Sequence, residues 1–160
     1  MFDTRNDLPV NARVEVTELL NARLADAIDL GAQSKYAHWN VKGPNFIALH
    51  ELFDKVAESL EDQVDVLAER ITALGGRAHG TIASVARQST LKPYPEDIAE
   101  GLAHVDALSA ALADYGAKIR AGIEAADKLG DADTADLFTG ISRENDKNLW
   151  LLEAHLHAKR

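Results

Sequence analysis

The sequence contains no cysteine, and this absence excludes disulfide bonds, thiol catalysis and cysteine-based zinc fingers. It also contains no apolar run near the ~18 residues that a membrane-spanning helix needs, and no N-terminal leader pattern. We therefore expect a soluble, cytoplasmic protein with no membrane partner. At 160 residues the chain is long enough for one domain with a sizeable core.

Basic residues are scarce relative to acidic ones. The chain has 17 Lys and Arg against 26 Asp and Glu, which gives a net charge of -9. Phosphate contacts require clustered Lys and Arg, so this balance disfavours nucleic-acid binding over the whole surface. The ends add little, because Asp3, Arg5 and Asp7 leave the N-terminal arm net negative and the C-terminus offers only Lys159 and Arg160. We expect direct DNA binding to be weak or absent.

Proline is also rare, with four in the chain, and apolar residues recur at helical spacing over long stretches. Residues 1–9 lack this period and are predicted to form a short arm, while 10–160 form a single domain. A long link over 77–94 separates the second long helix from the third, which predicts an all-α bundle of four helices with one crossover. The predicted long helices span about 10–41, 46–75, 95–126 and 133–157, with a short helix near 82–87.

The second long helix carries an unusual polar face. A solvated face normally mixes both signs and gains from ion pairs four residues apart, but this stripe has no Lys or Arg before Arg70. Like charges repel along it, and bound cations would remove that repulsion. At about 100° per residue, the stripe is roughly 100° wide and holds one histidine and five carboxylates: His50, Asp54, Glu58, Glu61, Asp65 and Glu69.

The spacing within the stripe gives two candidate half-sites. His50 and Asp54 are an i,i+4 pair, as are Asp65 and Glu69, so each pair can converge on one ion. Eleven residues separate the pairs, roughly 16 Å along a straight helix, which is too far to share a metal. They can meet if a second copy of the helix packs antiparallel across a two-fold axis near Ser59. The sequence also lacks Glu-x-x-His, the motif of di-iron centres within one bundle, which favours a site between subunits.

These motifs closely resemble those of the Dps mini-ferritins, which have a ferritin-like four-helix-bundle fold. The resemblance covers nearly the whole chain after the first ten residues, and the spacing of its five candidate ligands is highly specific. The matching segments are His38-Trp39-Asn40-Val41-Lys42-Gly43-Pro44-Asn45-Phe46, His50-Glu51, Asp54, Asp65-x-x-x-Glu69-Arg70, Leu74-Gly75-Gly76, Asp133-Thr134-Ala135-Asp136 and Asp146-Lys147-x-x-Leu149-Trp150.

The resemblance implies a ferroxidase site shared by two subunits related by a two-fold axis. One chain would supply His38, His50 and Asp54, and its mate Asp65 and Glu69. These five residues would be both the metal ligands and the catalytic residues. Imidazole and carboxylate ligands suit iron, and zinc is an alternative occupant of the same site.

The same resemblance implies an assembly and a reaction. The chain would form a homo-oligomer, a hollow dodecameric shell. It would oxidise Fe(II), with hydrogen peroxide as the preferred oxidant, and store ferric mineral inside. Consumption of both reactants would protect DNA indirectly. Two readings remain open beside it: a nucleoid-associated protein that compacts DNA directly, and a helical shell that only binds zinc.

Several other polar residues also have two interpretations. Glu51, Glu58 and Glu61 either nucleate ferric mineral or are surface carboxylates. Trp39 packs in the core, or sits near the iron site and takes part in electron transfer. The acidic residues at the start of the last helix either complement its dipole or line a cation pore around a three-fold axis; these are Asp131, Asp133 and Asp136. The remaining histidines are expected to be surface groups rather than ligands, although His79 or the His155 and His157 pair could bind an additional metal; these residues are His79, His104, His155 and His157.

Overall fold

The computed structural model describes residues 1–157, which form five α-helices and no β-strand beyond one isolated bridge. This confirms the predicted all-α fold with four long helices and a short one in the link. No helix within that range combines the length and the apolar character needed to cross a membrane. The helices are α1 (Val10–Asn40), α2 (Phe46–Ala73), α3 (Ile82–Gln88), α4 (Gly101–Lys128) and α5 (Ala132–Glu153).

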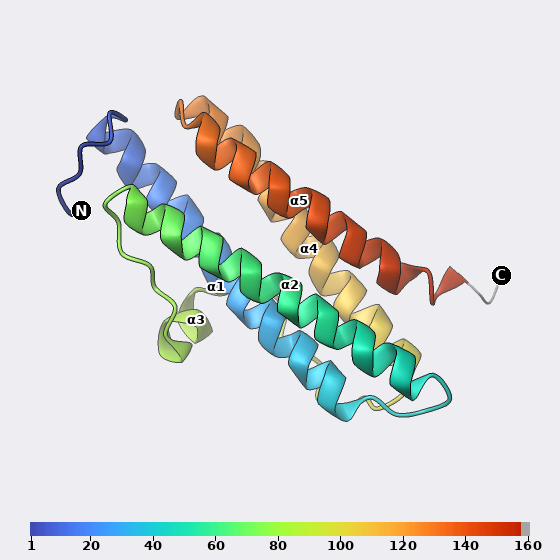
Figure 1. Ribbon diagram of the computed structural model, residues 1–160. Coiled ribbons are helices and arrows are strands. Elements are labelled where there is room, and N and C mark those ends of the chain that lie inside the picture. Colours follow the sequence, from blue (N-terminus) through green and yellow to red (C-terminus); the bar gives the residue numbers. More distant parts are fainter. Residues whose placement is uncertain (158–160) are drawn as a thin grey trace.

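The long helices form two antiparallel hairpins that pack together as a bundle (Figure 1). The hairpin of α1 and α2 lies beside that of α4 and α5, with α1 contacting α4 and α2 contacting α5. The crossover between α2 and α4 carries α3, which packs on α1. The largest buried side chains come from all four long helices and form one core; they include Leu24, Leu30, Phe53, Leu60, Leu108, Tyr115 and Phe138.

The start of α4 was predicted wrongly, because the helix begins at Gly101 rather than near Pro95. The segment before it is held extended when the backbone N–H of Lys42 donates to the carbonyl of Ala99 at 2.9 Å. The Glu100 side chain then accepts a hydrogen bond from a first-turn N–H, which caps the helix. A tertiary contact to the turn between α1 and α2 therefore overrides the local proline signal.

The last helix also ends earlier than predicted. α5 stops at Glu153, and residues 154–157 form a tight turn. Residues 158–160, which the prediction placed in the domain beyond this helix, lie outside the described residues.

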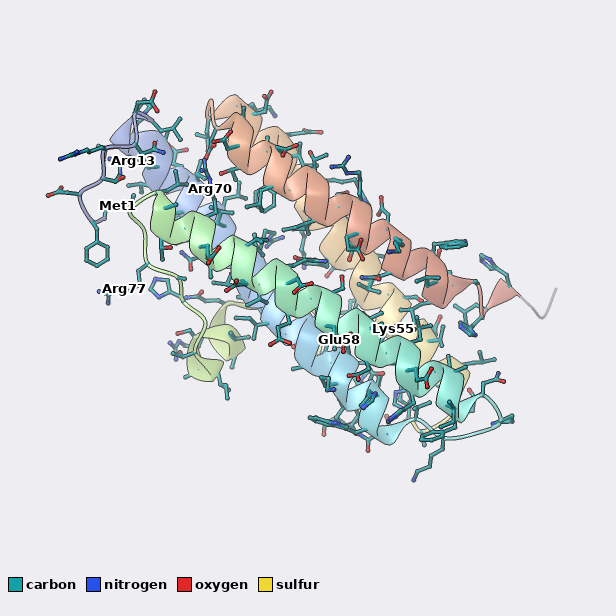
Figure 2. All side chains as sticks on the ribbon, viewed as in Figure 1. Met1, Arg13, Lys55, Glu58, Arg70 and Arg77 are labelled. Carbon is teal, nitrogen blue, oxygen red and sulfur yellow. The ribbon has the colours of Figure 1, made fainter. Side chains whose placement is uncertain are left out.

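Asp131 precedes α5, and it is buried with only 2% of its side chain exposed. Its carboxylate accepts from Arg70 at 2.7 Å and caps α5 through the N–H of Thr134 at 3.1 Å. Figure 2 shows Arg70 extending from the end of α2 toward the turn between α4 and α5. The prediction that Asp131 lines a cation pore is therefore wrong, because its oxygens are already used inside the subunit. Asp133 and Asp136 are exposed, and for them the pore stays a prediction.

The N-terminal arm is docked on the end of α2. The N–H of Phe2 donates to the carbonyl of Gly75 at 2.6 Å, and the Arg77 guanidinium lies 5.8 Å from the centre of the Phe2 ring. Gly75 has φ of +84°, a conformation that glycine adopts without strain. A Cβ there would also lie only 2.6 Å from the Phe2 carbonyl oxygen. The glycine is therefore needed both for the turn and for the close approach of the arm.

Candidate metal centre

Two histidines lie against each other where α1 ends and α2 begins. Their rings stack with centroids 3.7 Å apart and planes inclined by 21°. The Nδ1 of His38 lies 2.7 Å from the carbonyl oxygen of His50, and the Nδ1 of His50 lies 2.8 Å from the carbonyl oxygen of His38. The two residues thus fix each other across the turn of residues 41–45.

This exchange of hydrogen bonds determines which ring nitrogen is free. A carbonyl oxygen can only accept, so Nδ1 of each ring carries the proton and donates it. A neutral imidazole has a single N–H, so Nε2 of His38 and of His50 keeps its lone pair. A bond from Nδ1–H to a backbone carbonyl is a common partner of metal-binding histidines, because it fixes the ring orientation. The pair is therefore arranged to offer two nitrogen ligands.

Asp54 lies one turn after His50, with its Oδ1 4.0 Å from the Nδ1 of His38. The ammonium of Lys35 lies 2.5 Å from the same oxygen. This hydrogen bond is the main reason that the pKa of Asp54 lies below its usual value, and the nearby histidines act in the same direction while partial desolvation opposes them. The carboxylate is therefore ionised at neutral pH, and in this subunit the Lys35 ammonium is its cationic partner.

Lys35 was missed in the sequence analysis, although a signal for it existed. It lies three residues before His38 and so shares a face of α1 with it. What the sequence could not give was the distance across to α2, where the ammonium meets Asp54.

Asp65 and Glu69 differ from the histidine end of the stripe. Both are exposed, and no hydrogen bond or ion pair involves either carboxylate in the part of the chain that the structure describes. Among those residues, no three His, Asp or Glu side chains are grouped so that they could hold a metal. His38, His50 and Asp54 thus lie near one another within one subunit but do not form a metal-binding group by themselves, and Asp65 and Glu69 lie apart from them.

A groove between α1 and α2 runs from the histidine end along the stripe. It has a volume of about 500 Å³ and is lined by Lys35, Asp54, Glu58 and Glu61 together with apolar side chains. Both glutamates are exposed, as either of their two interpretations requires. The groove therefore places further carboxylates next to the histidine cluster.

Large apolar side chains are exposed around the histidines. Trp39 is 68% exposed and Ile47 61%, and the ring of Phe46 lies 5.1 Å from that of His50. Trp39 therefore does not pack in the core of the isolated subunit. Exposed apolar side chains that surround a polar cluster are typical of a surface that another protein covers.

The other histidines do not join this cluster. His79, His155 and His157 are at least partly exposed, as expected. His104 is different, because it is fully buried and its Nδ1 lies 2.7 Å from the Tyr94 hydroxyl. The prediction of a surface group was wrong for this residue, which occupies the apolar face of α4 four residues before Leu108.

Comparisons with known proteins identify the family of this chain. A family model described as a ferritin-like domain matches residues 17–160. The DNA protection during starvation protein of Agrobacterium fabrum is 47% identical over 156 residues, which cover 98% of this chain and 96% of that protein.

Solved structures show the same likeness. The Dps of Mycobacterium smegmatis superposes with a TM-score of 0.92 at 31% identity, over 98% of this chain and 96% of that one. The Dps of Vibrio cholerae, described as a member of a broad superfamily of ferritin-like diiron-carboxylate proteins, superposes with a TM-score of 0.90 at 26% identity, over 98% of each chain. The chain belongs to the ferritin-like family and, within it, to the Dps mini-ferritins.

Proposed function

We propose that the protein is a cytoplasmic ferroxidase and iron store, which oxidises Fe(II) with hydrogen peroxide at sites shared between two subunits. His38, His50 and Asp54 of one subunit bind the iron together with Asp65 and Glu69 of its mate. The observation that carries the proposal is the mutual fixing of the two histidines, which leaves both Nε2 atoms as ligands beside an ionised carboxylate.

The donor set fits iron as a substrate. Imidazole nitrogen and carboxylate oxygen are both good ligands for iron, and zinc can occupy the same ligands without being oxidised. The carboxylates of Asp65 and Glu69, which have no partner among residues 1–157, add their negative charge to that of Asp54. When two α2 helices cross antiparallel, each histidine end meets the carboxylate end of the other, and the pair of sites follows from the two-fold symmetry.

Membership of the Dps family supports assembly into a hollow dodecamer, and the exposed apolar residues around His38 and His50 support a subunit contact at this position. The net charge of -9 attracts cations to the shell. Inside it, the carboxylates of Glu51, Glu58 and Glu61 accept ferric ions and nucleate the mineral.

The reaction balances without any resident cofactor. Two Fe(II) ions give one electron each to one peroxide, whose O–O bond breaks, and hydrolysis of the two ferric ions to oxyhydroxide releases protons. The protein holds both ions and keeps the peroxide between them. DNA is protected because both reactants of hydroxyl-radical formation are consumed.

The proposal is tested by loading the assembled protein with Fe(II) without oxygen, adding peroxide and following ferric absorbance. Rapid oxidation is expected in the wild type and should be abolished in Asp65→Ala. Asp62→Ala is the matched control, because Asp62 is also an exposed carboxylate on α2 but does not belong to the stripe. Equal slow oxidation in all three proteins would overturn the proposal and favour a shell that only binds metal.

Direct DNA compaction is a weaker candidate. Residues 1–9 are net negative and docked through Phe2 on the carbonyl of Gly75, which disfavours phosphate contacts by this arm. We expect no plasmid binding at physiological salt, and a mobility shift that persists there would contradict this expectation.

A further inference from the structure

A buried histidine holds the crossover against α4. His104, in the first turn of α4, is fully buried, and its Nδ1 lies 2.7 Å from the hydroxyl of Tyr94 in the crossover. The two rings lie nearly parallel, with centroids 6.0 Å apart and planes inclined by 15°. A phenol can donate or accept, so both neutral tautomers of the imidazole can make this hydrogen bond. With either tautomer, Nε2 has no hydrogen-bond partner among residues 1–157.

The surroundings of His104 suit a neutral ring and not a charged one. From α2 the apolar ring of Phe53 faces it, with centroids 6.3 Å apart. From the crossover Tyr94 faces it, and burial raises the pKa of this phenol, so it offers no negative charge. The carboxylate whose charge acts on the ring is that of Glu100, which is exposed and already caps α4 by accepting from the N–H of Ala103 at 3.1 Å. No ion pair joins His104 to an acidic side chain in the described part of the chain.

Protonation of His104 would therefore place an uncompensated charge in the core. The added proton leaves a charged N–H at Nε2 with no acceptor, which is costly away from water. Burial accordingly lowers the pKa of His104, and the charge of Glu100 opposes this only in part. When the contact opens, the ring reaches water and regains its ordinary pKa of about 6.5. The open form then binds the proton more tightly, so stability of the closed form is present above that pH and is lost as the pH falls below it.

The segment that His104 holds is also attached to α1. The ring of Tyr36 lies 5.4 Å from that of Tyr94, and the Tyr36 hydroxyl donates to the carbonyl of Glu96 at 2.9 Å. Among the groups in these contacts, the imidazole of His104 is the one whose ordinary pKa lies between pH 5 and 8. His104 is therefore the point at which mild acid can act on this segment.

We propose that His104 is a pH-sensitive latch for the crossover. The neutral ring holds residues 94–99 against the bundle, and protonation in mild acid releases them. The latch is a property of the fold and goes beyond the proposed function, because it requires neither iron nor peroxide.

The same segment supports the turn between the two candidate iron-binding histidines. The N–H of Lys42, within the turn of residues 41–45, donates to the carbonyl of Ala99 at 2.9 Å. Release of the segment would remove this support, and the pair of His38 and His50 on either side of the turn would then be held less firmly. Weaker Fe(II) binding in mild acid is the expected consequence, and this consequence alone rests on the proposed function.

The latch is tested on the assembled, metal-free protein by hydrogen–deuterium exchange and mass spectrometry between pH 7.5 and 5.5, with the intrinsic exchange rates divided out. Two backbone amides report on it: that of Lys42, which donates to Ala99, and that of His104, which donates to the carbonyl of Glu100 at 3.2 Å. Their opening equilibrium should rise up to about ten-fold over this range, because the open form takes up one proton with a pKa of about 6.5. No rise in the wild type would overturn the proposal.

The variant His104→Gln separates titration from packing. The glutamine amide has both a donor and an acceptor, so it can replace either role of the imidazole toward Tyr94 but gains no charge in acid. Opening in this variant should stay constant from pH 7.5 to 5.5, and a rise equal to that of the wild type would mean that another group titrates. His79→Gln is the matched control, because His79 is an exposed histidine in the same link and its variant should keep the wild-type rise.

A second variant, Tyr94→Phe, keeps the ring and removes the hydrogen bond, and native mass spectrometry checks that each variant assembles. Opening of both reporter amides at pH 7.5 should increase about two- to ten-fold, as expected for loss of one hydrogen bond, while the rise in acid persists because His104 is still buried. Unchanged opening at pH 7.5 would show that the contact between Tyr94 and His104 does not hold the segment, and the proposal would fail even if His104→Gln did not assemble.

Anaerobic calorimetry with Fe(II) at both pH values tests the consequence for iron. The wild type should lose more affinity on acidification than His104→Gln does, since the iron ligands are the same in both proteins. Equal losses would overturn the link to the iron site and leave the latch, which is measured without metal, in place. Absence of peroxide-driven ferric product in the wild type would overturn the proposed function instead, and the exchange measurements would still decide the latch.

Discussion

The two ends of the acidic stripe on α2 are built differently. At the first end, His50 is fixed by its exchange of hydrogen bonds with His38, and Asp54 is paired with Lys35. At the other end, Asp65 and Glu69 are exposed and have no partner among residues 1–157. One end is organised by its own subunit before any ion arrives. The other end consists of two exposed carboxylates that the described part of the subunit leaves without a partner.

Under the proposed function, this difference allows one helix to contribute to two sites. A preorganised end keeps its geometry without the mate, so ion binding there costs little ordering. The carboxylates of Asp65 and Glu69 repel each other in the single subunit, and that repulsion is relieved only when cations lie beside them. Assembly and iron binding are therefore expected to favour each other.

The difference between the two ends of the stripe is tested most directly by damaging each end in a different subunit. His50→Ala and Asp65→Ala should each be inactive when assembled alone. If they are co-assembled at equal amounts, half of the dimers are mixed, and each mixed dimer keeps one intact site of two. Peroxide-driven oxidation should therefore recover to about a quarter of the wild-type rate.

The control is a co-assembly of His50→Ala with Asp54→Ala, which damages the same end in both subunits and should recover nothing. Recovery in this control, or none in the first mixture, would mean that the two ends do not meet across subunits. Native mass spectrometry of the two mixtures would verify that mixed dimers form equally in both.

A smaller effect is expected from disturbing the packing beneath the histidine end. A Cβ at Gly101 would lie 2.6 Å from Cδ1 of Leu49, the residue before His50. Gly101→Ala should therefore lower the free energy of unfolding by about 1–3 kcal/mol and weaken Fe(II) binding. Gly140→Ala is the matched control, because that site on α5 has no atom within 4 Å of the new Cβ. It should raise stability by about 0.5–1 kcal/mol through helix propensity.

Chemical denaturation of both variants and anaerobic calorimetry with Fe(II) would measure these changes. If Gly101→Ala lowered the free energy of unfolding but left Fe(II) affinity unchanged, the geometry of the histidine end would not depend on the core beneath it. The contrast between the two ends would then rest on their hydrogen bonds alone.

Much of this fold could be predicted from local patterns. Sequence patterns predicted the bounds of α1 and α2 nearly to the residue, because both helices are long and a glycine follows each within three residues. The start of α4 could not be found in the same way, since it depends on the hydrogen bond between Lys42 and Ala99, which are far apart in sequence. Local capping rules cannot anticipate such a contact.

In the candidate site, too, local sequence patterns predicted the positions of residues but not the contacts between helices. The positions of His50 and Asp54 on one face followed from helical spacing, but the free nitrogen of each histidine depends on a bond across the turn. The burial of His104 could have been found, because it precedes Leu108 by one turn on the inward face. Polarity alone was a poor guide there, since the Tyr94 hydroxyl compensates for burying the ring.

The smallest expected effect concerns Lys35, the positive charge at the organised end. The Lys35 ammonium lowers the pKa of Asp54, but the carboxylate would be ionised at neutral pH even without this lysine, because the ordinary pKa of aspartate lies well below 7. The main effect of the ammonium at Asp54 is therefore to compete with a cation for the carboxylate. Lys35→Met should therefore tighten anaerobic Fe(II) binding by about two- to five-fold, as expected for loss of one exposed ion pair. The matched control is Lys55→Met, because Lys55, labelled in Figure 2, is exposed and has no ion-pair partner among residues 1–157. Calorimetry with Fe(II) should find unchanged affinity in that control, whereas weaker binding in Lys35→Met would mean that the lysine orients Asp54 toward iron rather than competing with it.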